Sequence, residues 1–503
     1  MTAEGNASFT SMFTQAQLDV DTYSVDSTTG VAVTNQFDFA NSGCTYLSRS
    51  DWQGTWPTHD GEVSDVISTW GNEINGTDAE GNPASYVYIK TISNEDLAKL
   101  DGTDSLNPTD PASITDTPVY GADNGLSLID LRGKDYDDPL WESLLDQVTP
   151  EEYQNVITQS GYGNPEVSSV SKPFALDQDA ATGLSGGGTG MNYCGVIVLA
   201  QSWNQELAAR YGVMIGNEAL IGGTVGWYAP AMNIHRLPFS GRNNEYYSED
   251  GFLSGVMAAA SKGMYTFIKH FAVNDQENHR GDREGQFGLA TWSNEQAIRE
   301  IYLLPFQMCV ENDPVTLNYV EEDGNGGYVN TSRDYPAVTA VMTSFNRLGY
   351  TWTGGCYNLL TNVLRGEWGF NGFVITDNAN TGLFMDAYQM IEAGGDAKLT
   401  NEPASARWTF DQNNSAQYHY ARQAMHNVLY AVANSKLMNG LMPGSEYVNL
   451  MSIAQKILVG INIAAVVIIL ALAYFIFRGF KPTKKKAAKL AAKTEAKANG
   501  QKK

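Results

Sequence analysis

Five short apolar runs in this chain are each followed by polar side chains that could do chemistry. The clearest run, Phe373–Thr376, is typical of a buried strand and places Asp377 directly after it. The first run ends in Asp177 to Asp179, the third is followed by Lys269 with His270, and the fourth by Ser344 to Arg347. The second run leads into a loop with Asn233, His235 and Arg236, and Arg242 to Glu245 come after that loop. Because side chains at the carboxyl ends of parallel strands converge, the pattern predicts one shared site.

Each of these residues also has a purely structural interpretation. Asp377 alone would more often be the N-cap of the next helix. Arg242 with Glu245 would be an internal ion pair, and His270 a buried core histidine. Taken together, and with aromatic residues such as Trp352 nearby in the sequence, they indicate a carbohydrate site. A sugar ring needs hydrogen bonds around its edge and an apolar surface against its face.

The elements that must position these residues alternate along the chain. The strand-like runs are Pro173–Asp177, Val225–Asn233, Met264–Ile268, Val338–Ser344 and Phe373–Thr376. The helical stretches lie near Asn204–Leu220, Gly251–Lys262, Asn294–Glu311 and Tyr357–Glu367. Repeated strand–helix units predict a parallel sheet in an α/β fold, and we expect a closed TIM-like (β/α) barrel over residues 137–400.

Two nucleotide-binding alternatives are disfavoured by the sequence. A doubly wound sheet remains possible, but no glycine-rich dinucleotide loop follows the first strand. The run Ser185–Gly190 lacks the Lys-Ser/Thr ending of a phosphate-binding loop, so we expect an ordinary loop there. None of the six histidines forms an HxxxH pair and the four cysteines are widely spaced, so we expect no metal site, no cofactor and ordinary buried thiols.

The charge of the chain is divided unevenly between its body and its end. The net charge is −24, but the segment 478–503 carries +9, which leaves −33 for the rest. An acidic body does not suit a nucleic-acid binder, because such proteins neutralise phosphates with basic groups. We therefore expect no nucleic-acid partner.

A membrane anchor is predicted close to the carboxyl end. Ile457–Phe477 is 21 residues without a charge, bracketed by Lys456 and Arg478, and about 20 apolar residues in a helix cross a bilayer. A buried core helix is the alternative. The basic tail should remain cytoplasmic, which would place the body outside the cell. The amino terminus shows no basic and apolar leader, so we expect either a missing beginning or another export route.

Several segments together resemble one enzyme family. They are Gly241–Asp250, Lys269–Glu277, Glu295–Tyr302, Val341–Asn346, Leu364–Phe370 and Ala393–Asp396, in this order. The segments resemble the motifs of glycoside hydrolase family 3, over about residues 137–400. The resemblance implies a β-glucosidase-like enzyme that cleaves terminal β-linked sugars from an oligosaccharide or glycoside with retention.

The resemblance also implies roles for individual residues. The family's nucleophile falls on Asp377, and its sugar-binding residues fall on Asp179, Arg242, Lys269, His270 and Phe345. A retaining glycosidase needs an ionised nucleophile and a protonated carboxyl group about 5 Å away. Positive charges near the nucleophile would keep its pKa low.

Three departures from the family pattern alter these expectations. Asp179 is followed by Ala180 and Ala181 rather than Gly-Pro, and Asn378 stands where the family often has Trp. The family's general acid usually comes from a second, sandwich domain, and nothing after residue 400 is long enough to form one. Glu277 and Asp282 are the candidate acids within the chain.

The chain therefore looks like the rear half of a family member whose sandwich domain comes first. We expect a partly irregular connector at 1–136, the barrel at 137–400, a closing helix and linker at 401–452, a transmembrane helix at 457–477 and a basic tail at 478–503. A separate sandwich domain would then be a partner that supplies the acid. The alternatives are a carbohydrate-binding surface protein without its acid, and a transglycosylase that uses the same residues.

Overall fold

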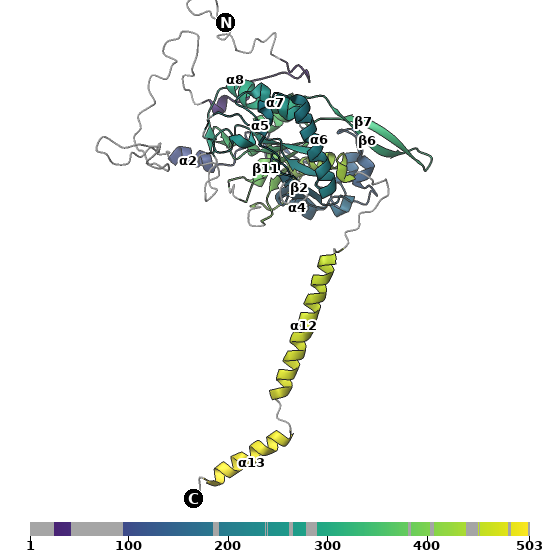
Figure 1. The fold of residues 1–503 in the computed structure, drawn as a ribbon, viewed down its shortest axis with the longest axis vertical. Coiled ribbons are helices and arrows are strands. Elements are labelled where there is room, and N and C mark those ends of the chain that lie inside the picture. The colour runs from purple at the N-terminus through teal and green to yellow at the C-terminus, as the bar shows by residue number, and fades with distance from the viewer. Residues whose placement is uncertain are drawn as a thin grey trace, which may run out of the picture. The chain divides into compact units, whose positions relative to one another are not determined.

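The computed structural model places most of the chain in two compact units, Met1–Ser445 and Glu446–Lys503. It describes residues 25–41, 94–184, 191–236, 238, 240–260, 265–277, 289–380, 384–402, 407–438, 451, 453–480 and 484–500. The predicted glycine-rich loop, the candidate acid Asp282 and Cys44 lie outside these residues. Figure 1 shows the elements of both units.

The first unit is built on a seven-stranded sheet with the order β1-β2-β3-β4-β8-β11-β12. Its strands are β1 (Gly163–Asn164), β2 (Ala175–Asp179), β3 (Gly226–Tyr228), β4 (Tyr265–Phe271), β8 (Ala340–Thr343), β11 (Phe373–Asn378) and β12 (Ala397–Leu399). From β2 to β12 every neighbouring pair is parallel, and only β1 is antiparallel. The five predicted strands and their parallel arrangement are thus confirmed.

Successive side chains of the central strands enter two different hydrophobic clusters. In β4, Phe267 packs in one cluster and Ile268 in the other, and in β11 Phe373 and Val374 divide in the same way. This alternation follows from the two-residue period of a strand. Both clusters are buried because helices cover both faces, and the first part of each strand is accordingly apolar on both faces.

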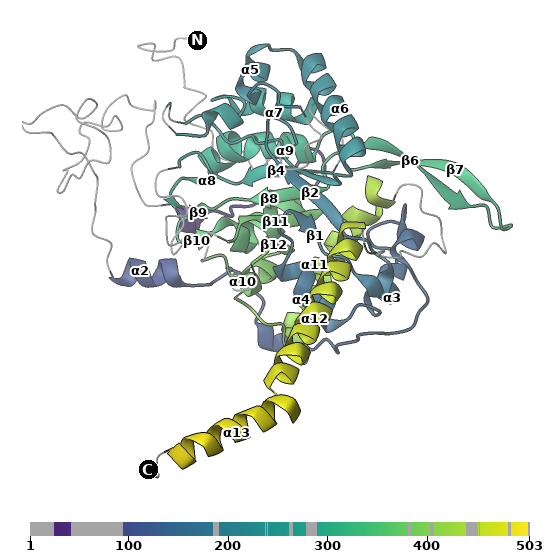
Figure 2. The ribbon, with the colours of Figure 1, turned by 60° about the horizontal axis from the view of Figure 1, so that its bottom comes forward.

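The helices around this sheet are α3 (Leu140–Leu145), α4 (Pro150–Thr158), α5 (Val196–Gln201), α6 (Gln205–Gly222), α7 (Gly251–Ala260), α8 (Glu295–Ala297), α9 (Leu304–Val310), α10 (Ala387–Glu392) and α11 (Ser415–Ala433). Two π-helical segments, Ile298–Leu303 and Asn358–Glu367, complete the predicted helices at 294–311 and 357–367. Figure 2 shows the strands in the middle, with α6, α7 and α9 on one side and α4, α10 and α11 on the other.

The two ends of the sheet are joined through the backbone just before β1. The amides of Ser160 and Gly161 donate to the carbonyl oxygens of Lys398 and Thr400, at 3.2 and 3.0 Å. The Asp177 amide of β2 donates to the Tyr162 carbonyl oxygen at 3.2 Å. The segment 160–162 therefore bridges β12 and β2, and brings the first and last parallel strands together.

Several elements were not predicted from the sequence. A hairpin of β6 (Val315–Glu322) and β7 (Tyr328–Tyr335) extends beyond the neighbouring helices (Figure 1). Three two-residue strands, β5 (Ala290–Thr291), β9 (Arg347–Leu348) and β10 (Thr351–Trp352), form a small separate sheet. The helix α2 (Asn94–Asp101) and short 3-10 turns at 38–40, 111–113, 128–131, 168–170, 243–245, 353–355 and 436–438 complete the unit.

The expectation of buried thiols is correct for two cysteines and wrong for one. Cys309 and Cys356 are buried, but Cys194 is exposed. Cys194 lies in an irregular segment that precedes α5, and such a segment leaves side chains accessible to solvent.

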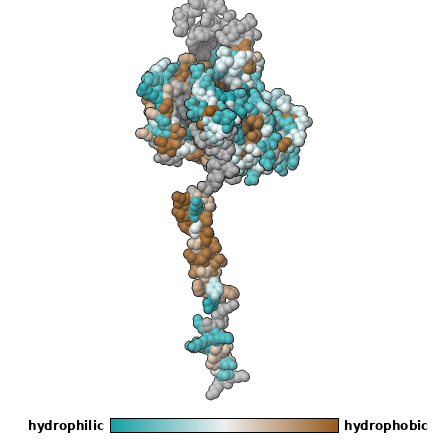
Figure 3. All heavy atoms as spheres, turned by 90° about the vertical axis from the view of Figure 1, so that its right-hand side faces the viewer, coloured by the Kyte–Doolittle hydropathy of each residue, from teal (hydrophilic) through white to brown (hydrophobic). Residues whose placement is uncertain are grey.

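The second unit contains the predicted apolar helix. The helix α12 (Ile453–Phe480) spans 28 residues, and α13 (Lys484–Gly500) follows it. By length and composition α12 is able to cross a membrane, with a mean hydropathy of 2.7 in its most apolar window. Figure 3 shows hydrophobic side chains around α12 and mostly hydrophilic ones on α13.

Candidate active site

Three parallel strands deliver the predicted site residues to one end of the sheet. Asp179 is the last residue of β2, Lys269 and His270 lie near the end of β4, and Asp377 is the penultimate residue of β11. Arg242 follows β3 after a loop. Because these strands run in the same direction, their carboxyl ends meet at one edge, as the sequence pattern predicted.

Lys269 is the buried centre of an ion-pair cluster. Its ammonium group lies 2.6 Å from Asp179 Oδ1 and 3.2 Å from Glu245 Oε1, and only 2% of its side chain is exposed. A buried cation requires such compensation, because an unpaired charge in the interior is costly. The two carboxylates in turn are held in fixed positions by Lys269.

Arg242 extends this cluster from Glu245 toward the other carboxylates. Its Nε and Nη2 donate to Glu245 Oε2 and Oε1 at 2.7 and 2.9 Å, a two-pronged contact that fixes the guanidinium plane. Its Nη1 lies 3.6 Å from Glu277 Oε1, and its Nη2 lies 3.1 Å from His270 Nε2. The Arg242–Glu245 ion pair is therefore present, within a larger arrangement.

His270 connects the cluster to Asp377. Its Nε2 lies 3.6 Å from Asp377 Oδ2, and its Nδ1 lies 3.2 Å from the Tyr246 hydroxyl. A guanidinium group can only donate, so in the neutral ring Nε2 accepts from Arg242 and Nδ1 carries the proton. The side chain of Asn233 binds both the amide and the carbonyl of His270, each at 2.9 Å, and so fixes its backbone.

Asp377 lies on the strand itself and not at a helix start. Its Oδ1 accepts from the amide of Asn378 at 2.7 Å, and 8% of the residue is exposed. The next helix, α10, is capped by Asp386 instead, whose side chain accepts from the Gln389 amide. The interpretation of Asp377 as an N-cap is therefore wrong.

The cluster keeps its charged groups ionised. Burial acts to raise the pKa of Asp179, but the charge and hydrogen bond of Lys269, the Ala180 amide and the charge of Arg242 together hold this pKa below its usual value. For Glu245, burial also acts to raise the pKa, and Lys269 and Arg242 together lower it. Burial acts to lower the pKa of Lys269, but the two carboxylates raise it. The site thus presents fixed carboxylate acceptors at neutral pH.

Phe345 and Glu277 occupy different surroundings. Phe345 directly follows β8 and is only 4% exposed, within the same hydrophobic cluster as Trp352 and Ile375. Glu277 accepts from the Asn274 side chain at 3.2 Å and lies near Arg242. Of the two candidate acids, Glu277 is therefore the one that the described residues place beside the cluster.

Three further residues, Glu245, Tyr246 and Asn274, belong to the cluster but were not among the predicted site residues. Glu245 was recognised only as part of an ion pair, although it contacts both Lys269 and Arg242. Tyr246 binds His270 and receives a hydrogen bond from Asn274 at 2.8 Å. Each lies in a motif that the sequence displays, but its contacts depend on the fold.

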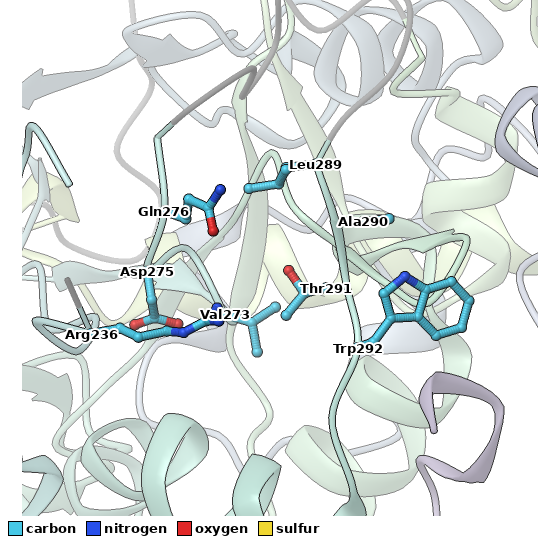
Figure 4. A pocket seen from close by; sticks show the side chains of 8 residues that line it. All are labelled: Arg236, Val273, Asp275, Gln276, Leu289, Ala290, Thr291 and Trp292. Carbon is cyan, nitrogen blue, oxygen red and sulfur yellow. The ribbon is translucent and has the colours of Figure 1, made fainter. Parts of the chain in front are cut away.

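A cavity of about 250 Å³ lies beside the segment that follows β4 (Figure 4). Its lining residues are Arg236, Val273, Asp275, Gln276, Leu289, Ala290, Thr291 and Trp292. Figure 4 shows the side chains of Asp275 and Arg236 close together at one end, and Trp292 at the other. Of the polar side chains that the sequence pattern brought together, only Arg236 lines this cavity, and no residue of the charged cluster around Lys269 does.

Comparisons with known proteins identify a domain family and several relatives. Residues 147–318 match the sequence model of the glycosyl hydrolase family 3 N-terminal domain. A β-glucosidase A from Butyrivibrio fibrisolvens is 34% identical over 251 residues, which are 48% of this chain and 26% of that protein. A β-glucosidase from Rhizobium radiobacter is 32% identical over 249 residues, which are 47% of this chain and 27% of that protein.

A solved structure supports the fold. The β-glucosidase from Paenibacillus barengoltzii aligns with a TM-score of 0.51 and 23% identity, over 75% of this chain and 40% of that chain. The chain spans only about a quarter of the length of the two curated relatives. Within that limit, the comparisons identify residues 147–318 of this chain as a glycosyl hydrolase family 3 N-terminal domain.

Proposed function

We propose that this chain acts on β-glucosides as a retaining glycoside hydrolase, with Asp377 as the nucleophile. One observation carries the proposal: Asp179, Lys269, Glu245, Arg242, His270 and Asp377 form one continuous series of contacts at the carboxyl ends of the strands. The relatives named as β-glucosidases supply the substrate class.

The proposed mechanism assigns binding and attack to different parts of the cluster. Asp179, Lys269 and Arg242 would bind sugar hydroxyl groups, since they offer acceptors and donors in fixed positions. His270 would orient the sugar beside Asp377, with Phe345 completing the site from the end of β8. Asp377 would then attack the anomeric carbon and form a glycosyl-enzyme, which water hydrolyses with retention.

The leaving-group oxygen requires a proton donor. We propose that a separate sandwich domain supplies it, with Glu277 as the donor from within the chain if no such domain takes part. General acid catalysis typically contributes about 10²–10⁴-fold, and it matters most for poor leaving groups. The chain alone should therefore hydrolyse activated aryl glucosides much better than disaccharides.

The domain plan belongs to the same proposal. A connector over 1–136 would precede a TIM-like barrel over 137–400. A closing helix and linker over 401–452 would then lead from the barrel to a membrane helix at 457–477. The basic tail at 478–503 would lie in the cytoplasm and the catalytic body outside. The uncharged run 457–477 within α12 and the lysine-rich α13 support this topology.

The test compares two aspartates that lie close together in the sequence. Asp377→Asn should lower kcat/KM for an aryl β-glucoside by at least about 10³-fold, since it removes the nucleophile. Asp386→Asn is the control, because Asn caps a helix as well as Asp does and should leave activity unchanged. Retained activity in Asp377→Asn would refute the proposed function. Sugar binding without turnover in the unaltered chain would favour the carbohydrate-binding alternative.

A further inference from the structure

One exposed aromatic side chain lies at the same edge of the sheet as the charged cluster. Tyr162 is in the segment between α4 and β1 and is 40% exposed. The rest of its surface packs on Tyr228 at the end of β3, with the ring centroids 5.9 Å apart and the planes tilted by 45°. Most other tyrosines of the first unit's core, such as Tyr153, are buried.

The backbone holds Tyr162 firmly in this position. Its carbonyl oxygen accepts from the Asp177 amide of β2, while Gly161 is bound to Thr400 after β12. Its φ of +54° lies in the left-handed region, which disfavours residues with a Cβ atom and is found mostly where structure imposes it. Tyr162 is therefore fixed at the junction of the first and last parallel strands.

The hydroxyl group of Tyr162 faces the charged cluster. It forms a hydrogen bond with the side chain of Asn378, and it lies within the field of Asp179, Asp377 and Lys269. Burial and then the two carboxylate charges raise the pKa of this hydroxyl, so it stays protonated at neutral pH. Tyr162, which is 40% exposed, thus stands at the carboxyl edge of the sheet close to Asp179 and Asp377.

We propose that Tyr162 forms an aromatic wall of the sugar site and positions the pyranose ring of the substrate against Asp377. The C–H face of a sugar packs on an exposed aromatic face, while Asp179 and Lys269 bind the hydroxyl groups at its edge. The residue that follows the nucleophile, Asn378, is an amide, and its hydrogen bond fixes the Tyr162 ring from the side of β11. This role rests on the proposed glycosidase function.

The test uses the full chain and 2,4-dinitrophenyl 2-deoxy-2-fluoro-β-D-glucoside, which reports binding and covalent attack separately. Tyr162→Leu fills similar space without a flat ring, and Tyr162→Phe keeps the ring. We expect Tyr162→Leu to weaken reversible binding of the probe by about three- to tenfold. Its limiting rate of labelling should change less than twofold. Tyr162→Phe should bind within about twofold of the unaltered chain.

The control is Tyr328→Leu, which removes a tyrosine that is 49% exposed from the hairpin strand β7. It should leave both constants unchanged. Unaltered binding in a folded Tyr162→Leu chain that is still labelled would overturn the role of Tyr162 alone. If Tyr162→Leu does not fold, Tyr162→Trp and Tyr162→Phe replace it as the test variants. Equal weakening of probe binding in these two variants and in Tyr328→Leu would then overturn the proposed role of Tyr162. Absence of labelling in the unaltered chain would instead overturn the proposed function and this role with it.

Discussion

At the residue scale, the site is a balance of charges around one buried cation. Lys269 holds two carboxylates, and Arg242 and His270 continue the contacts to Asp377. Sequence patterns could nominate most of these residues, because motif and strand position point to the same set. The patterns suggested the Arg242–Glu245 pair, but they could not show that Lys269 also binds Glu245 or that His270 Nε2 lies 3.6 Å from Asp377 Oδ2.

One buried carboxyl group outside the cluster should make stability depend on pH. Burial raises the pKa of Asp275 to about 7, against the opposing effects of the Ile234 amide and the Arg236 charge. The unfolded carboxyl has a pKa of about 4, so between pH 4 and 7 the folded state binds the additional proton. Stability contributed by this group is therefore fully present below pH 4 and is lost as the pH rises toward 7.

Asp275→Asn removes this titration and should flatten the pH dependence of stability. The slope of the unfolding free energy between pH 5 and 7 should change by up to about 1.4 kcal/mol per pH unit. Urea unfolding of the variant and the unaltered chain at three pH values measures this slope. Parallel lines for the two proteins would contradict the raised pKa of Asp275.

At the element scale, sequence periodicity was a good guide to the central strands and a poor one to short elements. The runs that became β4 and β11 are apolar on both faces, and that composition is distinctive. β12 has three residues, Ala397 to Leu399, and includes a buried lysine, so no periodic signal could reveal it. The β6–β7 hairpin is polar and exposed along much of its length, so it lacks the apolar composition that marks the central strands.

The bridge between β12 and β2 makes a specific demand on Gly161. A Cβ atom there would lie 2.6 Å from the carbonyl carbon of Thr400, which is backbone and cannot move aside easily. We expect Gly161→Ala to lower the unfolding free energy by about 1–3 kcal/mol, as overpacking does elsewhere. Denaturant unfolding measures this change.

Gly366→Ala is the matched control for that substitution. Gly366 is exposed in a helical segment, and an added Cβ atom would meet only the Thr361 carbonyl oxygen at 3.1 Å. Alanine is preferred to glycine within helices, so stability should stay within about 1 kcal/mol of the unaltered chain. Equal losses for the two variants would show that the bridge is not the sensitive point.

At the scale of the whole molecule, the chain combines an acidic body with an apolar helix and a basic end. Composition predicted this division, because an uncharged run of 21 residues is rare in a soluble body. The structure contains the helix and separates the chain at Ser445. The described residues form a seven-stranded sheet, and six of its strands are parallel. The closed barrel stays a prediction, because this strand order alone does not establish closure.

Removal of residues 453–503 should convert a membrane-bound chain into a soluble one with its fold retained. The deleted segment consists of α12 and α13 with the residues that follow each, and the hydrophobic clusters of the first unit are formed, among the described residues, by positions up to Met438. Sedimentation with membranes, before and after extraction with high salt, measures the change. A truncated chain that still sediments after salt extraction would contradict the anchor.

Asp377 as nucleophile is the central claim, and covalent labelling tests it most directly. The unaltered chain is incubated with 2,4-dinitrophenyl 2-deoxy-2-fluoro-β-D-glucoside, whose good leaving group needs little acid assistance. Protease digestion and mass spectrometry then locate the added fluoroglucosyl group. We predict that the label lies on the peptide containing Asp377 and is absent from Asp377→Asn. A label on Glu245, Glu277 or any other carboxylate would contradict the claim.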